Sequence, residues 1–190
     1  MFESKNKYFG RKKGKSFARL EQFQKYLVPP STDFFKQIGK PRVLEIGIGD
    51  GEKISSDAKL YSNINYIGCD IFADGVLRAI RNSKENSLKN LFVFHLNIQD
   101  ILPFIPAKYF DGIRVFFPDP WPKTKHKRRR TFNNELVQTL SSKLKKNGYI
   151  HFATDHGDYF LDALVLLQDQ GYQMDNISPN SWKYNEFNAL

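Results

Sequence analysis

A run of fifteen residues, Phe116 to Arg130, places one carboxylate beside a dense cluster of cations. Asp119 stands among three prolines, Pro118, Pro120 and Pro122. Proline fixes its own φ and keeps the residue before it out of helix, so we expect Asp119 on a stiff loop. From Lys123 to Arg130 six of eight residues are basic, a seventh is His126, and none is acidic. This combination favours an active-site acid next to a phosphate-binding surface.

Runs of Lys and Arg also occur on solvated faces and in import signals. Here the run follows a proline-rich loop that leaves an apolar strand, Ile113 to Phe117, and a solvated face needs no such loop. The order therefore favours contact with nucleic acid. Within the loop, Trp121 either stacks on a base or covers the core, and burial is the commoner use of an indole.

A second set of residues surrounds a glycine-rich turn. A short strand runs through Glu45 into Gly47, Gly49, Asp50 and Gly51, and a helix is expected from about Glu52. Gly47 and Gly49 permit a tight turn and close approach of a ligand to the backbone. The spacing differs from the dinucleotide pattern G-x-G-x-x-G, and the acids disfavour a pyrophosphate. A cationic ligand without phosphate, S-adenosylmethionine, fits better than NAD.

Polar residues after the next two strands extend this site. Asp70 stands nineteen residues after Gly51, where its carboxylate can accept hydrogen bonds from both ribose hydroxyls. Asn97 or Asp100 could read the adenine amino group, although a helix N-cap is the commoner role for Asp100. Glu45 has an alternative role too, as a partner of the helix N-terminus.

The elements that must position these residues alternate along the chain. Short runs rich in β-branched and aromatic residues are expected as strands: Val43 to Ile46, Tyr66 to Cys69, Leu91 to Leu96, Ile113 to Phe117 and Tyr149 to Ala153. The segments between them show helical spacing, such as Leu136, Leu140 and Leu144. This alternation predicts an α/β fold with a doubly wound, mostly parallel sheet, helices on both faces, and ligands at the carboxyl ends of the strands.

Composition limits the class of protein. The chain has 190 residues, 41% of them hydrophobic, which suits one packed domain. Its net charge of +9 favours an acidic partner. No segment approaches the roughly 20 apolar residues of a membrane span, and the basic start lacks the apolar core of a signal peptide, so a cytoplasmic protein is expected. One cysteine, Cys69, and four scattered histidines give no metal-ligand pattern.

The first 20 residues carry seven basic side chains and one acid. We expect residues 1–20 to form a basic arm, mobile without a partner, and residues 21–190 to form a single domain. The arm could contact RNA or could simply keep the protein in solution.

These motifs, in this order, resemble the bacterial tRNA (guanine-N7)-methyltransferases. The resemblance rests on the basic segment Phe9 to Gly14, Glu45 to Gly49, Asp70, the loop Phe117 to Lys123 with its basic run, and Ala153 to Asp155. It implies a Rossmann-like, S-adenosylmethionine-dependent enzyme that methylates guanosine 46 in the variable loop of tRNA. One departure is the C-terminus, Ser181 to Leu190, which lacks the family's substrate-holding Thr-Arg/Lys-Phe/Tyr-Glu segment.

Carried over from the family, four residues are expected to bind the cofactor: Glu45, Asp70, Asn97 and Asp119. Gly47 and Gly49 of the glycine-rich turn are expected to bind it with them. Asp119 is also the expected catalytic residue. Lys123 and Asp155 are expected to contact tRNA, as are Arg128 and Arg129 of the basic run. For Asp155 an N-cap of the following helix is an alternative role.

Two other classes of function compete with this one. A non-catalytic RNA-binding protein would have no reason to keep acids at positions 45, 70 and 119, and a small-molecule methyltransferase would not require two cationic segments. The sequence leaves open whether the protein is a monomer or a homodimer.

Overall fold

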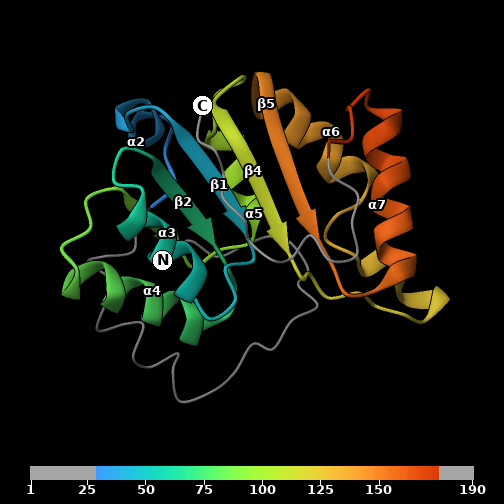
Figure 1. Cartoon of the computed structure of the whole chain (residues 1–190), viewed down its shortest axis with the longest axis horizontal. Coiled ribbons are helices and arrows are strands. Elements are labelled where there is room, and N and C mark those ends of the chain that lie inside the picture. The colour runs from blue at the N-terminus through green and yellow to red at the C-terminus, as the bar shows by residue number, and fades with distance from the viewer. Residues whose placement is uncertain (1–28, 176–190) are drawn as a thin grey trace.

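The computed structural model describes residues 29–175, and these contain one five-stranded sheet (Figure 1). The strands are β1 (Arg42–Ile46), β2 (Asn65–Cys69), β3 (Leu91–Phe94), β4 (Phe110–Phe116) and β5 (Leu144–Ala153). All neighbouring strands are parallel, in the order β3-β2-β1-β4-β5. From β1 the chain adds β2 and β3 on one side of the sheet, and it then crosses to add β4 and β5 on the other side. The strand order therefore reverses between β1 and β4, and open α/β sheets bind their ligands at such a point.

Helices cover both faces of the sheet, as predicted (Figure 1). The helical segments are α2 (Thr32–Gln37), α3 (Glu52–Leu60), α4 (Ala73–Glu85), α5 (Ile98–Ile101), η2 (Leu102–Phe104), η3 (Thr124–Arg129), α6 (Asn134–Lys143) and α7 (Gly157–Asp169). Polar side chains fix the starts of two of these helices: the side chain of Ser31 caps α2, and that of Asn133 caps α6.

Two cores result because successive residues of a strand point to opposite faces. Val43 packs with the buried residues of α3 and α4, whereas Leu44 packs with those of α5, α6 and α7. Both faces of β1 are thus buried, which explains why its sequence is a continuous rather than an alternating apolar run.

The predicted strands agree with the observed ones except near their ends. Leu96 lies beyond β3, and Phe117 leaves β4 with a positive φ of 47°. The largest error concerns Leu144, which was predicted on the helix of Leu136 and Leu140. It begins β5 and pairs with Phe110 instead, while a register irregularity lies between Phe110 and Gly112. Helical spacing could not reveal that the helix passes directly into a strand.

The basic arm of residues 1–20 and the C-terminal segment Ser181 to Leu190 lie outside the described residues, so the predicted domain limits stay predictions. Within residues 29–175, no helix has both the length and the apolar character that a membrane crossing requires.

Candidate active site

The glycine-rich turn between β1 and α3 is built on backbone that favours glycine. Gly47, Gly49 and Gly51 have φ values of 74°, 57° and 76°. A Cβ placed on Gly47 or Gly49 would meet no atom of residues 29–175 within 4 Å, so within this part of the chain open space lies over both residues. A ligand can therefore come close to the backbone here, as the sequence predicted for this turn.

Gly51 and Gly75 serve packing instead. A Cβ on Gly51 would lie 2.7 Å from the carbonyl oxygen of Gly75, and one on Gly75 would lie 1.6 Å from the carbonyl oxygen of Gly49. The first turn of α4 thus touches the glycine-rich turn backbone to backbone. Gly75 was not among the predicted site residues, because a glycine near the start of a helix has no distinctive spacing.

Asp70 directly follows β2 and holds the glycine-rich turn in place. Its Oδ2 accepts a hydrogen bond from the Gly49 amide at 2.8 Å, and its Oδ1 accepts one from the Phe72 amide at 2.7 Å. Burial raises the pKa of Asp70, while the amides of Phe72 and Gly49 oppose that rise. The carboxylate lies where the sequence placed it, and it also fixes the shape of the turn.

Glu45 lies within β1 rather than on the turn, and it is only 2% exposed. Its side chain faces Arg114 of β4, whose Nη1 is 3.9 Å from Oε2 of Glu45 but 2.6 Å from Oδ2 of Asp57 on α3. Asp57 takes the closer contact, and Oε2 of Glu45 has no hydrogen-bond partner among the described residues. Burial, only partly offset by Arg114, raises the pKa of Glu45 to about 7.

This group of buried charges went partly unpredicted. Arg114 and Asp57 were not selected from the sequence, although a signal was available. Arg114 stands between Ile113 and Val115 in an apolar strand, and a charge in such a place must find a partner.

The third strand leads to Asn97, which caps α5: its side chain accepts a hydrogen bond from the Gln99 amide at 3.1 Å. The N-cap role that the sequence suggested for Asp100 is therefore wrong. Asp100 lies in the first turn of α5 and is 8% exposed. Asn97 follows the carboxyl end of β3, and its contact with a cofactor stays a prediction.

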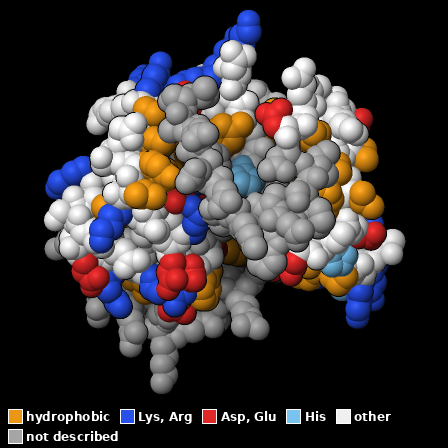
Figure 2. Space-filling model, viewed as in Figure 1, with side chains coloured by type: hydrophobic (Ala, Val, Ile, Leu, Met, Phe, Trp, Pro, Cys, Tyr) orange, Lys and Arg blue, Asp and Glu red, His pale blue; other side chains and the backbone are white. Residues whose placement is uncertain are grey.

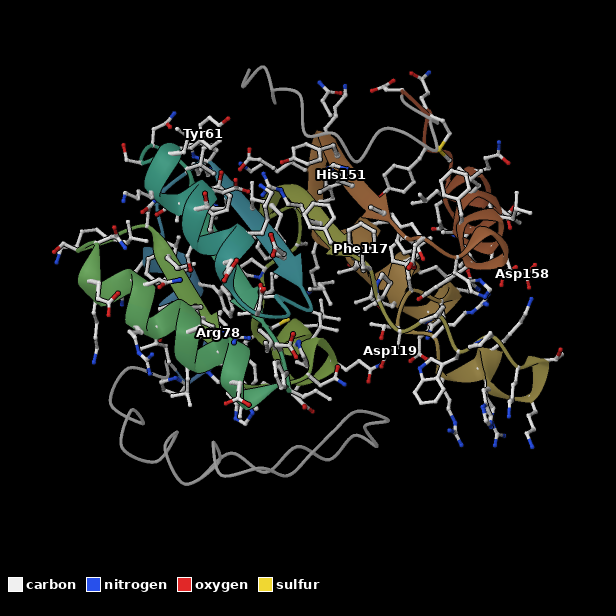
Figure 3. All side chains as sticks on the ribbon, turned by 60° about the horizontal axis from the view of Figure 1, so that its bottom comes forward. Tyr61, Arg78, Phe117, Asp119, His151 and Asp158 are labelled. Atoms are coloured by element: carbon white, nitrogen blue, oxygen red, sulfur yellow. The ribbon has the colours of Figure 1, made fainter. Side chains whose placement is uncertain are left out.

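Asp119 is exposed on the loop after β4, between the sheet and η3 (Figure 3). The loop leaves the sheet with a hydrogen bond from the Phe117 amide to the Ala153 carbonyl, 2.8 Å long. Phe117 and Trp121 both have positive φ, 47° and 42°, on either side of Asp119. Because β1 and β4 are paired and parallel, Asp119 and the glycine-rich turn leave the same edge of the sheet.

The basic run divides into outward-facing and engaged side chains. Lys123 and Arg128 are exposed, consistent with contact to a polyanion. Arg129 is half-buried, with its guanidinium 5.1 Å from the centre of the Trp121 ring. Arg130 is 4% exposed, so its inclusion in the phosphate-binding surface was wrong. Spacing within a basic run does not show which residue turns inward.

Trp121 was expected either to stack on a base or to cover the core, and it is neither fully exposed nor fully buried. It packs against two side chains of η3. The centre of the His126 ring lies 5.9 Å from that of the indole, and the Arg129 guanidinium lies over the indole ring. The indole thus helps to give the basic helix η3 a fixed shape.

Asp155 is exposed at the end of β5. The alternative N-cap role is wrong, because His156 is the N-cap of α7 and its side chain makes no capping hydrogen bond. The structure therefore places Asp155 at the same sheet edge as Asp119, at the ends of the neighbouring strands β5 and β4.

Comparison with known proteins gives this arrangement a context. Residues 39–188 match a family model described as "Putative methyltransferase". A bifunctional methyltransferase of Rickettsia prowazekii (strain Madrid E) is 36% identical over 172 residues, which cover 87% of this chain and 33% of the relative. A tRNA (guanine-N(7)-)-methyltransferase of Thiobacillus denitrificans is 39% identical over 137 residues, covering 72% of this chain and 60% of the relative. The chain thus spans between a third and about 60% of these relatives.

Solved structures share the fold. An antibiotic-related methyltransferase superposes with a TM-score of 0.59 at 21% identity, covering 78% of each chain. A precorrin-6y C5,15-methyltransferase from Geobacter metallireducens gives 0.58 at 15% identity, covering 75% of this chain and 69% of the other. At these identities the likeness concerns the fold alone.

Proposed function

The chain belongs to the methyltransferase family that includes tRNA (guanine-N7)-methyltransferases, and on this premise we propose that it methylates N7 of guanosine 46 in the variable loop of tRNA, with S-adenosylmethionine as methyl donor. One observation carries the proposal. The glycine-rich turn, Asp70, Asp119 and the basic helix η3 all lie at one edge of the sheet, around the point where strand order reverses.

The residues of the turn fit this cofactor. Within residues 29–175 open space lies over Gly47 and Gly49. Acids flank the turn, namely Glu45 and Asp50 in the sequence and Asp70, which accepts a hydrogen bond from the Gly49 amide. In the part of the chain that the structure describes, Oε2 of Glu45 has no hydrogen-bond partner, so a cationic ligand could supply one. We propose that the cofactor is held by Glu45, Gly47, Gly49, Asp70, Asn97 and Asp119. When bound, S-adenosylmethionine supplies an electrophilic methyl group.

The protein's own task is mainly positioning. Guanine N7 carries a lone pair and no proton, so no residue needs to remove a proton from the attacking atom. Holding the base in line with the methyl group can contribute several of the roughly 7 to 11 kcal/mol available from such alignment. We assign this role to Asp119, whose carboxylate can accept hydrogen bonds from N1–H and N2–H of guanine. Its charge also favours the cationic product ring over the neutral base.

The remaining predicted residues serve the tRNA. Lys123, Arg128 and Arg129 project from or lie beside η3, and we propose that they contact phosphates. Asp155 at the adjacent strand end would help to hold the base. Because tRNA is the substrate, we propose a cytoplasmic location.

The test is methyl transfer to unmodified tRNA, using labelled S-adenosylmethionine followed by nucleoside mapping. We expect N7-methylguanosine at position 46, and none when that guanosine is replaced by adenosine. Tight binding of NAD with no response to S-adenosylhomocysteine would overturn the cofactor assignment. Binding of tRNA without any methyl transfer would instead indicate an RNA-binding protein.

Asp119→Ala should abolish or severely reduce methyl transfer while the protein stays folded, because the side chain is exposed and outside both cores. Asp119→Asn keeps the size and one acceptor but loses the charge, so its rate should be intermediate. The control is Asp169→Asn, an exposed carboxylate at the far end of α7. Single-turnover rates measure all three, and near-normal turnover by Asp119→Ala would exclude this carboxylate from the mechanism.

A further inference from the structure

Arg130 ends the basic run, but its guanidinium is directed into the protein and not toward solvent. It is 4% exposed. Its Nε donates a hydrogen bond of 2.8 Å to the carbonyl oxygen of Pro120, the residue after Asp119. Its Nη1 donates to Oδ2 of Asp162 on α7, and its Cζ lies 4.5 Å from the centre of the Tyr159 ring. One side chain thus joins the loop to the helix.

The partners of Arg130 are themselves held in place. Tyr159 is fully buried, and its hydroxyl accepts a hydrogen bond of 2.9 Å from the Phe132 amide. Burial raises the pKa of Tyr159 to about 12, while the Phe132 amide and the Arg130 guanidinium oppose that rise. Lys127 adds ion pairs to Asp158 at 3.1 Å and Asp162 at 3.7 Å.

The contact with Pro120 determines how Asp119 is presented. A residue before proline is confined to extended backbone, and Asp119 is also preceded by Pro118. Once the Pro120 carbonyl is fixed, the backbone at Asp119 has little freedom left. The loop is then held on both sides of Asp119, by the Phe117–Ala153 hydrogen bond on one side and Arg130 on the other.

We propose that Arg130 and Asp162 are positioning residues that hold the loop of Asp119 in its reactive orientation. The proposal rests on the proposed function of Asp119. It removes Arg130 from the tRNA contacts and gives Asp162, which no sequence motif marks, a part in the reaction. Lysine could not replace Arg130. The planar guanidinium donates to the Pro120 carbonyl and to the Asp162 carboxylate while it lies over the Tyr159 ring, and a single ammonium group lacks this planar arrangement of donors.

The first experiment reads the loop without substrate. The chain has two tryptophans, Trp121 in the loop and Trp182 outside the described residues, so Trp182→Phe makes Trp121 the single reporter. In this background, first matched to the wild-type protein in melting temperature, Asp162→Asn and Arg130→Lys should raise the acrylamide quenching constant of Trp121 at least about twofold. Asp158→Asn removes an equal charge one turn earlier on α7, where within residues 29–175 the carboxylate pairs with Lys127 and not with Arg130, and it should leave the quenching unchanged.

The second experiment separates positioning from binding. Asp162→Asn should lower kcat about 10- to 100-fold, while the Kd values for tRNA and S-adenosylhomocysteine stay within about twofold of those of the parent. Asp158→Asn should keep the parental kcat. A purely structural role predicts a lower melting temperature with kcat unchanged below the transition, and that result would overturn the proposal.

An unchanged quenching constant in Asp162→Asn and Arg130→Lys would overturn it as well. The fluorescence experiment needs no turnover, so it tests the anchor even where the wild-type protein transfers no methyl group. That absence of transfer would contradict the proposed function and leave the anchoring of the loop to be decided by the quenching data.

Discussion

At the scale of single residues, the least ordinary group is the carboxyl of Glu45. It lies in a buried strand with an arginine that is engaged more closely by Asp57. A buried carboxylate in this position costs free energy unless a cation completes its environment. The apparent defect suits a site built for a cationic ligand.

This arrangement predicts an unusual pH dependence of stability. The pKa of Glu45 is raised from 4.5 to about 7 in the folded protein. The folded state therefore binds the proton more tightly, and this residue's contribution to stability, present at low pH, is lost as pH rises through about 7. Glu45→Gln should remove that loss and make the unliganded protein more stable above neutral pH, by about 2 to 3 kcal/mol.

Denaturant unfolding at pH 5 and pH 8 measures the effect as a difference in the free energy of unfolding between the two proteins. Glu52→Gln is the control, since Glu52 is exposed at the start of α3 and should give no such difference. A gap between Glu45→Gln and the wild-type protein that does not grow with pH would contradict the assignment.

At the scale of elements, the site depends on how turns and helix starts meet. Asp70 ties the glycine-rich turn to the start of α4 by accepting from Gly49 and Phe72. Gly75 then brings α4 against the same turn. Three short segments thus share one rigid conformation.

Gly75→Ala should accordingly destabilise the protein by at least about 2 kcal/mol, because the new methyl group would overlap the Gly49 carbonyl oxygen. Affinity for S-adenosylhomocysteine should fall with it. Gly157→Ala is the matched control: a Cβ there meets no described atom within 4 Å, and the expected change stays under about 1 kcal/mol. Thermal unfolding and calorimetric titration of both variants check this, and equal behaviour would exclude the close packing as the cause.

The elements also show what sequence could and could not supply. The five strands and the turn after β1 were predicted because runs of β-branched and aromatic residues and clusters of glycine are local signals. Asp70 and Asp119 could be selected because they follow strand ends. The inward turn of Arg130, the Arg114–Asp57 pair and the contact of Gly75 could not, because each depends on which segments meet in space. The N-caps of α5 and α7 were misassigned by one to three residues, since several polar residues compete at such boundaries.

At the scale of the whole molecule, the net charge is +9, but not every cation of the basic run is exposed to a partner. A group of Lys and Arg side chains extends at the lower right of Figure 2, the side on which Figure 1 shows the segment after β4. Of that segment, Lys127 and Arg130 are engaged by acids of α7, whereas Lys123, Lys125 and Arg128 are exposed. The formal charge of the run therefore overstates what a polyanion would meet.

Salt dependence of tRNA binding tests this distribution. Because phosphate contacts release counterions, Lys125→Gln or Arg128→Gln should each flatten the slope of log affinity against log salt by about 0.7 to 0.9. Lys59 is an exposed cation in the last turn of α3, at the end of the helix away from the glycine-rich turn, and Lys59→Gln should leave the slope unchanged. Filter binding over a range of salt concentrations measures the slopes, and identical slopes for all variants would remove η3 from the tRNA surface.

The basic arm is tested in the same assay. Deletion of residues 1–15 should weaken tRNA binding without altering the affinity for S-adenosylhomocysteine, since every residue proposed to hold the cofactor lies after residue 40 of the sequence. If the deletion leaves both the affinity for tRNA and the salt slope as they were, the arm only keeps the protein in solution.

The backbone contact at Gly75 also has a genetic consequence. Every other amino acid carries a Cβ, so each missense change at that codon would force the same overlap with the Gly49 carbonyl. In a saturation library selected for methyl transfer, Gly75 should therefore tolerate replacement as poorly as Asp119, although no ligand is proposed to touch its side. Intolerance in such a library would therefore identify close backbone contacts between segments as well as catalytic residues.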